Sequence, residues 1–104
     1  MRETEFINVC EQELEKIGEM LEKKDVNSAL DIEYLDGILN IEIVANGKKY
    51  VINRNSGNQK IWYSSPFSGA DYFTYDDNKN SWFNDSGVEL SAKLFNELDQ
   101  ILND

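Results

Sequence analysis

The sequence has no histidine, one cysteine (Cys10) and one proline among its 104 residues. Histidine is the usual general base near neutral pH and the commonest ligand of transition metals, so neither role can be filled in the ordinary way. Any bound metal has to meet carboxylates, carbonyl groups and water, which are the ligands of hard cations. A single cysteine cannot form an internal disulfide, which fits a reducing compartment.

Long apolar runs are also missing. No segment approaches the ~20 apolar residues that a membrane span requires. The N-terminal residues 1–16 have neither the apolar stretch of a secretory signal nor the arginine-rich, acid-poor composition of a transit peptide. We therefore expect a cytoplasmic protein that does not contact membranes, with residues 1–104 forming one domain.

Positive charge is scarce, because 10 basic residues face 20 acidic residues and give a net charge of −10. The imbalance is concentrated in residues 1–42, which hold 12 acids and 4 bases, whereas residues 43–104 hold 8 acids and 6 bases. Such a chain repels nucleic acid. It attracts cations and the basic surfaces of other proteins.

Sequence motifs of catalysis and of tight ligand binding are absent as well. The chain has no Ser–His–Asp or Cys–His combination, no P-loop, and no GxGxxG after a strand. The segment DDNKNSWFNDSG (residues 76–87) begins like a calcium loop, but Ser81 and Gly87 replace the glycine and glutamate of that motif. Cys10 lies in an apolar helical stripe, which favours a buried thiol over a nucleophile.

The apolar residues that are present follow two periods. A helical period predicts a first helix over residues 3–23 and a last helix over residues 90–103. Between them the period is two, and short connections separate six strands; Asp36-Gly37 and Asn46-Gly47 are typical of tight hairpins. We predict an α+β two-layer sandwich of order α-β6-α, with both helices packed on one face of an antiparallel sheet of about six strands.

The opposite face of this sheet should be open to water, as antiparallel sheets permit. In YVINRNSGNQKIWYSS (residues 50–65) strand alternation divides the side chains into two sets. The inward set is Tyr50, Ile52, Ile61 and Tyr63, and the outward set is Val51, Asn53, Lys60, Trp62 and Ser64. Two alternatives remain open for Trp62: packing against another outward aromatic residue, or a bulge near Ser56-Gly57 that reverses the faces.

Acidic residues gather along one side of the first helix and continue beyond it. Spacings of three and four place four glutamates on one helix side, a turn aspartate follows, and two more acids lie two apart on the first strand. We call this set the acidic ridge; it comprises Glu11, Glu15, Glu19, Glu22, Asp25, Asp31 and Glu33. The alternative is an ordinary solvated helix face, with Lys16 and Lys23 offsetting part of the repulsion.

Taken together, GILNIEIVANGKKYVINRNSGNQKIWYSSPFSG (residues 37–69), a later tryptophan and GVELSAKLFNEL (residues 87–98) resemble the frataxin family, including its bacterial branch. The most specific part is YVIN, a polar loop, IW and then SSP-x-SG. The resemblance covers nearly the whole chain. It implies two helices packed against one antiparallel sheet.

The resemblance also implies weak binding of Fe²⁺ or Fe³⁺ at the acidic ridge, with Glu3 as a more peripheral ligand, and no organic cofactor. Gly18, Lys23, Asn27 and Ala29 stand where relatives often carry acids, which weakens the local field. Exposed carboxylates alone give loose, water-rich coordination, so we expect Mn²⁺, Co²⁺ or Ca²⁺ to compete.

Partners follow from the resemblance too. Frataxins dock on the cysteine desulfurase and the scaffold protein of iron–sulfur cluster assembly, and modulate sulfur transfer there. Positions matching Asn53, Asn55 and Trp62 belong to the docking surface, and Arg54, Asn58 and Lys60 lie within reach of a partner. A tryptophan on a wet face suits this role, because it combines a large apolar area with an N–H donor.

The resemblance therefore favours a non-enzymatic, monomeric iron chaperone and regulator of cluster assembly, with iron-dependent oligomers as an open alternative. A second hypothesis is an iron oxidase or storage protein that uses its surface carboxylates. A third is an acidic decoy that mimics nucleic acid and occupies a basic protein.

Overall fold

The computed structural model describes residues 1–25 and 27–102. Two helices enclose six strands in the chain order α1, β1 to β6, α2. The bounds are α1 Glu3–Lys24, β1 Leu30–Leu35, β2 Ile38–Ile43, β3 Lys49–Asn55, β4 Lys60–Ser65, β5 Gly69–Asp76, β6 Ser81–Phe83 and α2 Leu90–Leu102. The predicted last helix therefore begins where expected, and its predicted end, Asn103, lies outside the described residues.

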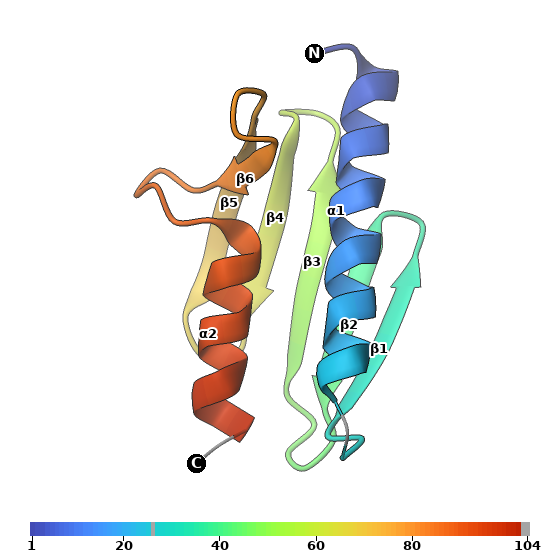
Figure 1. The fold of residues 1–104 in the computed structure, drawn as a ribbon, viewed down its shortest axis with the longest axis vertical. Coiled ribbons are helices and arrows are strands. Elements are labelled where there is room, and N and C mark those ends of the chain that lie inside the picture. Colours follow the sequence, from blue (N-terminus) through green and yellow to red (C-terminus); the bar gives the residue numbers. More distant parts are fainter. Residues whose placement is uncertain (26, 103–104) are drawn as a thin grey trace.

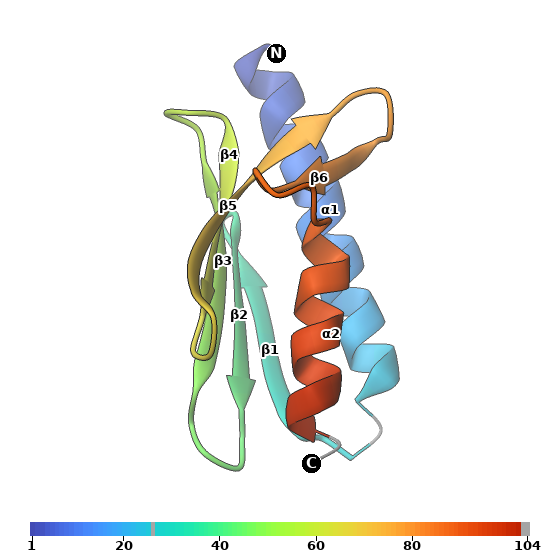
Figure 2. The same cartoon turned by 90° about the vertical axis from the view of Figure 1, so that its left-hand side faces the viewer.

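The strands form one antiparallel sheet in which spatial order equals chain order, from β1 at one edge to β6 at the other. Both helices pack on the same face of this sheet (Figure 1), and the turned view shows the other face uncovered (Figure 2). The predicted α+β two-layer sandwich is confirmed. No helix in the described part of the chain is long and apolar enough to cross a membrane.

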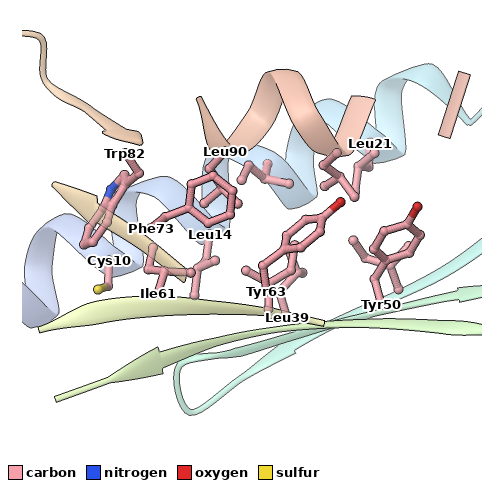
Figure 3. Packing of buried hydrophobic residues seen from close by; sticks show 14 of the residues in the cluster. Cys10, Leu14, Leu21, Leu39, Tyr50, Ile61, Tyr63, Phe73, Trp82 and Leu90 are labelled. Atoms are coloured by element: carbon pink, nitrogen blue, oxygen red, sulfur yellow. The ribbon is translucent and has the colours of Figure 1, made fainter. Parts of the chain in front are cut away.

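The core lies between the two layers, where the apolar stripes of the helices meet the inward side chains of the strands. α1 buries Phe6, Cys10, Leu14, Ile17 and Leu21, which recur at steps of four, four, three and four residues and so form one stripe along the helix. Aromatic rings of the sheet fill the space below α2 (Figure 3), with edge-on contacts such as the 5.7 Å between the ring centroids of Tyr63 and Phe73. Burial raises the pKa of the Cys10 thiol to about 12, which keeps this cysteine protonated and unreactive.

Tight turns hold the sheet register. At the β1–β2 turn Asp36 and Gly37 both have positive φ, 52° and 78°, as a two-residue hairpin that follows the twist of the strands requires. At the β2–β3 turn only Gly47 is left-handed, and its N–H donates to the carbonyl of Ile43. Both dipeptides therefore form the predicted hairpins, through different backbone geometries.

Strand alternation places the central side chains as expected. Tyr50, Ile52, Ile61 and Tyr63 are buried, with at most 1% of each exposed, whereas 44% of Trp62 is exposed. Pairing of Asn53 with Trp62 continues without interruption to Asn55 with Lys60, so no bulge reverses the faces. The uncovered sheet face thus carries the exposed indole.

Candidate functional site

The helical part of the acidic ridge lies where α1 passes over the edge strand β1. Glu11, Glu15, Glu19 and Glu22 are all exposed. The last three line a shallow groove of about 170 Å³ together with Ile32 and Tyr34 of β1. Gly18 lies at the same place and, lacking a side chain, leaves the groove open. The structure therefore brings three ridge glutamates together beside β1.

The strand part of the ridge faces the opposite side of the sheet. Asp31 and Glu33 are exposed and alternate with Ile32 and Tyr34, so they point away from the helices. Asp31 stands directly opposite Glu42 of β2, a like-charged cross-strand pair that costs stability. The acidic ridge therefore wraps around the edge at β1 instead of forming one flat surface.

Two ridge members already have structural partners. The carboxylate of Asp25 accepts hydrogen bonds from the N–H groups of Ala29 (2.7 Å) and Leu30 (3.0 Å), and so shapes the connection from α1 to β1. Glu11 lies 4.0 Å from the guanidinium of Arg54. Glu3 is exposed in the first turn of α1, eight residues and about 12 Å along the helix axis from Glu11. Asp25 and Glu11 are therefore less available to a cation than Glu15, Glu19 and Glu22, and Glu3 lies too far along the helix to share an ion with them.

The donor groups of the acidic ridge determine which kind of cation it could bind and how tightly. Within residues 1–25 and 27–102, no group of three or more acids or cysteines is arranged to hold one ion between them. The donors present are carboxylate oxygens on a solvated helix, which suit a hydrated hard cation that keeps most of its water. In the groove beside β1, the oxygen donors are the carboxylates of Glu15, Glu19 and Glu22.

The open sheet face carries a row of uncharged, mostly apolar side chains that could not be predicted from the sequence alone. Strand pairing aligns five residues into one cross-strand row: Leu35, Ile38, Asn53, Trp62 and Tyr72. Leu35, Trp62 and Tyr72 are 64%, 44% and 44% exposed, which is high for such large apolar side chains. The indole of Trp62 also meets the ring of Tyr72 edge-on at 5.5 Å, so packing against an outward aromatic residue and exposure to solvent occur together.

The other expected docking residues divide between two sides of the sheet. Lys60 and Asn55 face each other across β3 and β4, and Asn58 is exposed in the turn that joins these strands. Arg54 shares the inward side with Ile52 and reaches Glu11 near the helices. The structure thus brings Asn53, Asn55, Lys60 and Trp62 together and places Arg54 elsewhere.

A polar cluster anchors α2 to the end of the sheet. The carboxylate of Glu97 accepts hydrogen bonds from the hydroxyls of Tyr50 (3.0 Å), Ser65 (2.7 Å) and Ser68 (2.9 Å). Burial, together with the nearby Glu97 carboxylate, raises the pKa of the Tyr63 hydroxyl, so this phenol stays neutral. The SSPFS turn is therefore held by α2, which gives the motif a structural role.

Fold and surfaces together define a small open-faced α+β sandwich whose distinctive chemistry lies on its exterior. A family model described as Frataxin-like domain matches residues 1–104, and the chain therefore belongs to the frataxin family.

Two relatives illustrate the match in sequence. The iron-sulfur cluster assembly protein CyaY of Thioalkalivibrio sulfidiphilus is 34% identical over 95 residues, which cover 90% of this chain and 87% of that protein. The mitochondrial frataxin of Dictyostelium discoideum is 34% identical over 100 residues, which cover 92% of this chain and 51% of that protein. The chain thus spans about half the length of the second relative. Neither name describes an enzyme class.

Solved structures agree with the architecture. Frataxin from Psychromonas ingrahamii has a TM-score of 0.83 at 25% identity, over 96% of this chain and 90% of that chain. Trimeric frataxin from the yeast Saccharomyces cerevisiae, complexed with ferrous iron, has a TM-score of 0.79 at 27% identity, over 92% of this chain and 87% of that chain. The family is linked to iron–sulfur cluster assembly through the name of its CyaY relative.

Proposed function

We propose that this protein is a non-enzymatic iron chaperone and regulator of iron–sulfur cluster assembly that docks on a cysteine desulfurase and its scaffold protein. In this proposal residues 1–104 act as one domain, as a monomer in the bacterial cytoplasm. The acidic ridge holds iron loosely and meets a basic surface of the desulfurase. The cross-strand row meets the scaffold.

One observation carries the proposal: an acidic ridge and an exposed apolar row occur on the same small molecule, at the β1 edge and on the uncovered sheet face. Carboxylates supply long-range attraction and loose ion binding, whereas Trp62 supplies the apolar anchor of a specific interface. The uncharged row also argues against a decoy that mimics nucleic acid, because such a decoy would present negative charge instead.

Docking through Trp62 can be tested by calorimetry with purified desulfurase and scaffold. We expect Trp62→Ala to weaken the ternary complex about 10- to 30-fold, as loss of a central aromatic anchor does. Phe67→Ala is the matched control, since Phe67 is also an exposed aromatic residue (46%) but lies in the turn after β4. Equal affinity of wild type and Trp62→Ala, with both proteins folded, would contradict the docking surface.

The regulatory role of the ridge can be tested in a desulfurase activity assay with and without Fe²⁺. The double variant Glu19→Lys/Glu22→Lys should remove both the effect on the desulfurase and its response to iron. Asp85→Lys/Asp99→Lys changes the net charge equally at exposed acids outside the ridge and should behave like wild type. If the alternative of an iron oxidase holds, the wild type will consume oxygen with saturable kinetics that the ridge variant loses.

A further inference from the structure

The edge strand β1 has a row of free backbone groups. The N–H of Ile43 donates to Lys48 on the β3 side, so the opposed pair of Leu30 and Ile43 exchanges no hydrogen bonds. In an antiparallel ladder this pattern alternates, and therefore the N–H and C=O groups of Ile32 and Tyr34 also point outward. Among the described residues, none accepts a hydrogen bond from the outward N–H groups of Ile32 and Tyr34.

A groove runs along the helix side of the same edge. It lies between α1 and β1, with Ile32 and Tyr34 as its apolar floor and Glu15, Glu19 and Glu22 along its helix wall. Side chains of a strand added beside β1 would alternate between this groove and the open face of the sheet. The groove, at about 170 Å³, has room for small aliphatic side chains.

Charge selects what can occupy the edge. Asp31 and Glu33 flank the free groups on the open-face side, and β1 contains no lysine, arginine or proline. A second copy of β1 would place these acids against each other, which is the like-charge arrangement that protects edge strands from self-association. If the added strand instead carried arginine or lysine opposite Asp31 and Glu33, these charge pairs would attract each other.

We propose that β1 binds an extended basic segment of a partner protein by antiparallel strand addition. Small apolar residues of that segment lie opposite Ile32 and Tyr34 and enter the groove. Its alternate residues are arginine or lysine and lie opposite Asp31 and Glu33. This inference deepens the proposed function, from which it takes the basic partner, because it states how the acidic ridge would hold that partner.

An eight-residue capped peptide of alternating arginine and valine is the probe. With full-length protein, amide hydrogen exchange at Ile32 and Tyr34 should slow at least tenfold when the peptide is present, because strand addition occupies these N–H groups. Amides of β5 should be unaffected. Unchanged exchange at Ile32 and Tyr34 under saturating peptide would overturn the proposal.

Two N-methylated peptides separate strand addition from simple charge attraction. Methyl groups on the valine nitrogens remove the donors that face β1 and should abolish binding, whereas methyl groups on the arginine nitrogens point to solvent and should leave it within about twofold. Equal affinity of the two peptides would contradict the proposal. The proposal would also be contradicted if a second copy of the protein occupied β1 instead of the peptide. Sedimentation would then detect a dimer.

Protein variants provide an independent control. Asp31→Asn/Glu33→Gln should weaken the peptide about tenfold, and Asp85→Asn/Asp99→Asn, with the same change in net charge, should weaken it less than twofold. Equal weakening by both pairs would overturn the proposal. The proposed function is tested by a different result. It is contradicted if no complex with the desulfurase forms, or if ridge variants do not alter that complex, whatever the hydrogen exchange at Ile32 and Tyr34 shows.

Discussion

Asp71 joins three elements through one carboxylate. It accepts hydrogen bonds from the side-chain amide of Asn84 (2.9 Å), the ammonium of Lys93 (3.0 Å) and the N–H of Tyr72 (2.8 Å). Partial burial opposes its ionisation, but the hydrogen bonds from Asn84 and Lys93 outweigh that effect and lower the pKa of Asp71 below its ordinary value of 3.8. β5, the segment after β6 and α2 are thus linked by a charge-dependent contact.

Asp71→Asn should lower the free energy of unfolding by about 1 kcal/mol at pH 7, since Lys93 loses its ion pair. A lowered pKa stabilises the folded state above the ordinary value of 3.8, and this contribution is lost as the pH falls through the folded-state pKa. The difference between wild type and variant should therefore shrink below about pH 4 in urea titrations. A constant difference from pH 7 to pH 2.5 would refute this account, and the exposed Asp99→Asn serves as the control.

Alternation along β3 and β4 was enough to predict that Trp62 is exposed and that Tyr63 is buried, because each strand has a period of two and only one covered face. The roles of Asp25 and Arg54 could not be predicted, since they depend on loop geometry and on contacts between distant segments. Asp25 binds the amides of Ala29 and Leu30, and Arg54 reaches across to α1.

At the scale of elements, the apolar stripe of α1 holds this helix against the sheet. The buried Gly18 in the middle of α1 lowers the stability of the helix, because glycine has a low helix propensity. A Cβ at this position would meet the Cδ1 atom of Leu39 at 3.7 Å, an ordinary contact. Gly37 in the β1–β2 turn is different: its φ is 78°, and a Cβ would meet the Cζ atom of Arg54 at 2.8 Å.

The same substitution should therefore have opposite effects at the two sites. Gly18→Ala should raise the free energy of unfolding by about 0.5–1 kcal/mol through better helix propensity. Gly37→Ala should lower it by about 1–2 kcal/mol, because alanine is strained at positive φ. Urea denaturation of both variants tests the pair, and destabilisation by Gly18→Ala would show that the groove beside α1 is tighter than its geometry indicates.

Element order and the two layers followed from periodicity and short connections, which leave few topologies for six strands between two helices. The cross-strand row did not follow, because it depends on the register of four strand pairings. Leu35 and Tyr72 are far apart in sequence, and only this register aligns them with Trp62.

For the molecule as a whole, a net charge of −10 on 104 residues produces strong self-repulsion. Most of the excess charge lies in residues 1–42, which form α1, β1 and most of β2. Cations that collect at the acidic ridge should therefore stabilise the fold, and their effect should depend on charge more than on the identity of the metal.

We expect millimolar Mg²⁺, Ca²⁺ or Mn²⁺ to raise the melting temperature by a few degrees, since about 1 kcal/mol shifts Tm by 4–8 °C in a chain of this size. The triple variant Glu15→Gln/Glu19→Gln/Glu22→Gln should lose most of this increase and retain the smaller effect of sodium chloride. Thermal melts monitored by circular dichroism measure both. An equal response of variant and wild type would show that the divalent ions bind elsewhere.

The two tryptophans occupy opposite environments: Trp62 is 44% exposed on the open sheet face, and Trp82 is 1% exposed in the core. Intrinsic fluorescence thus contains two separable signals. A partner that covers the sheet would shift the emission of Trp62 to the blue and protect it from iodide, while Trp82 would stay unchanged until the chain unfolds. Intrinsic tryptophan fluorescence can therefore report docking through Trp62 and unfolding through Trp82 without an added label.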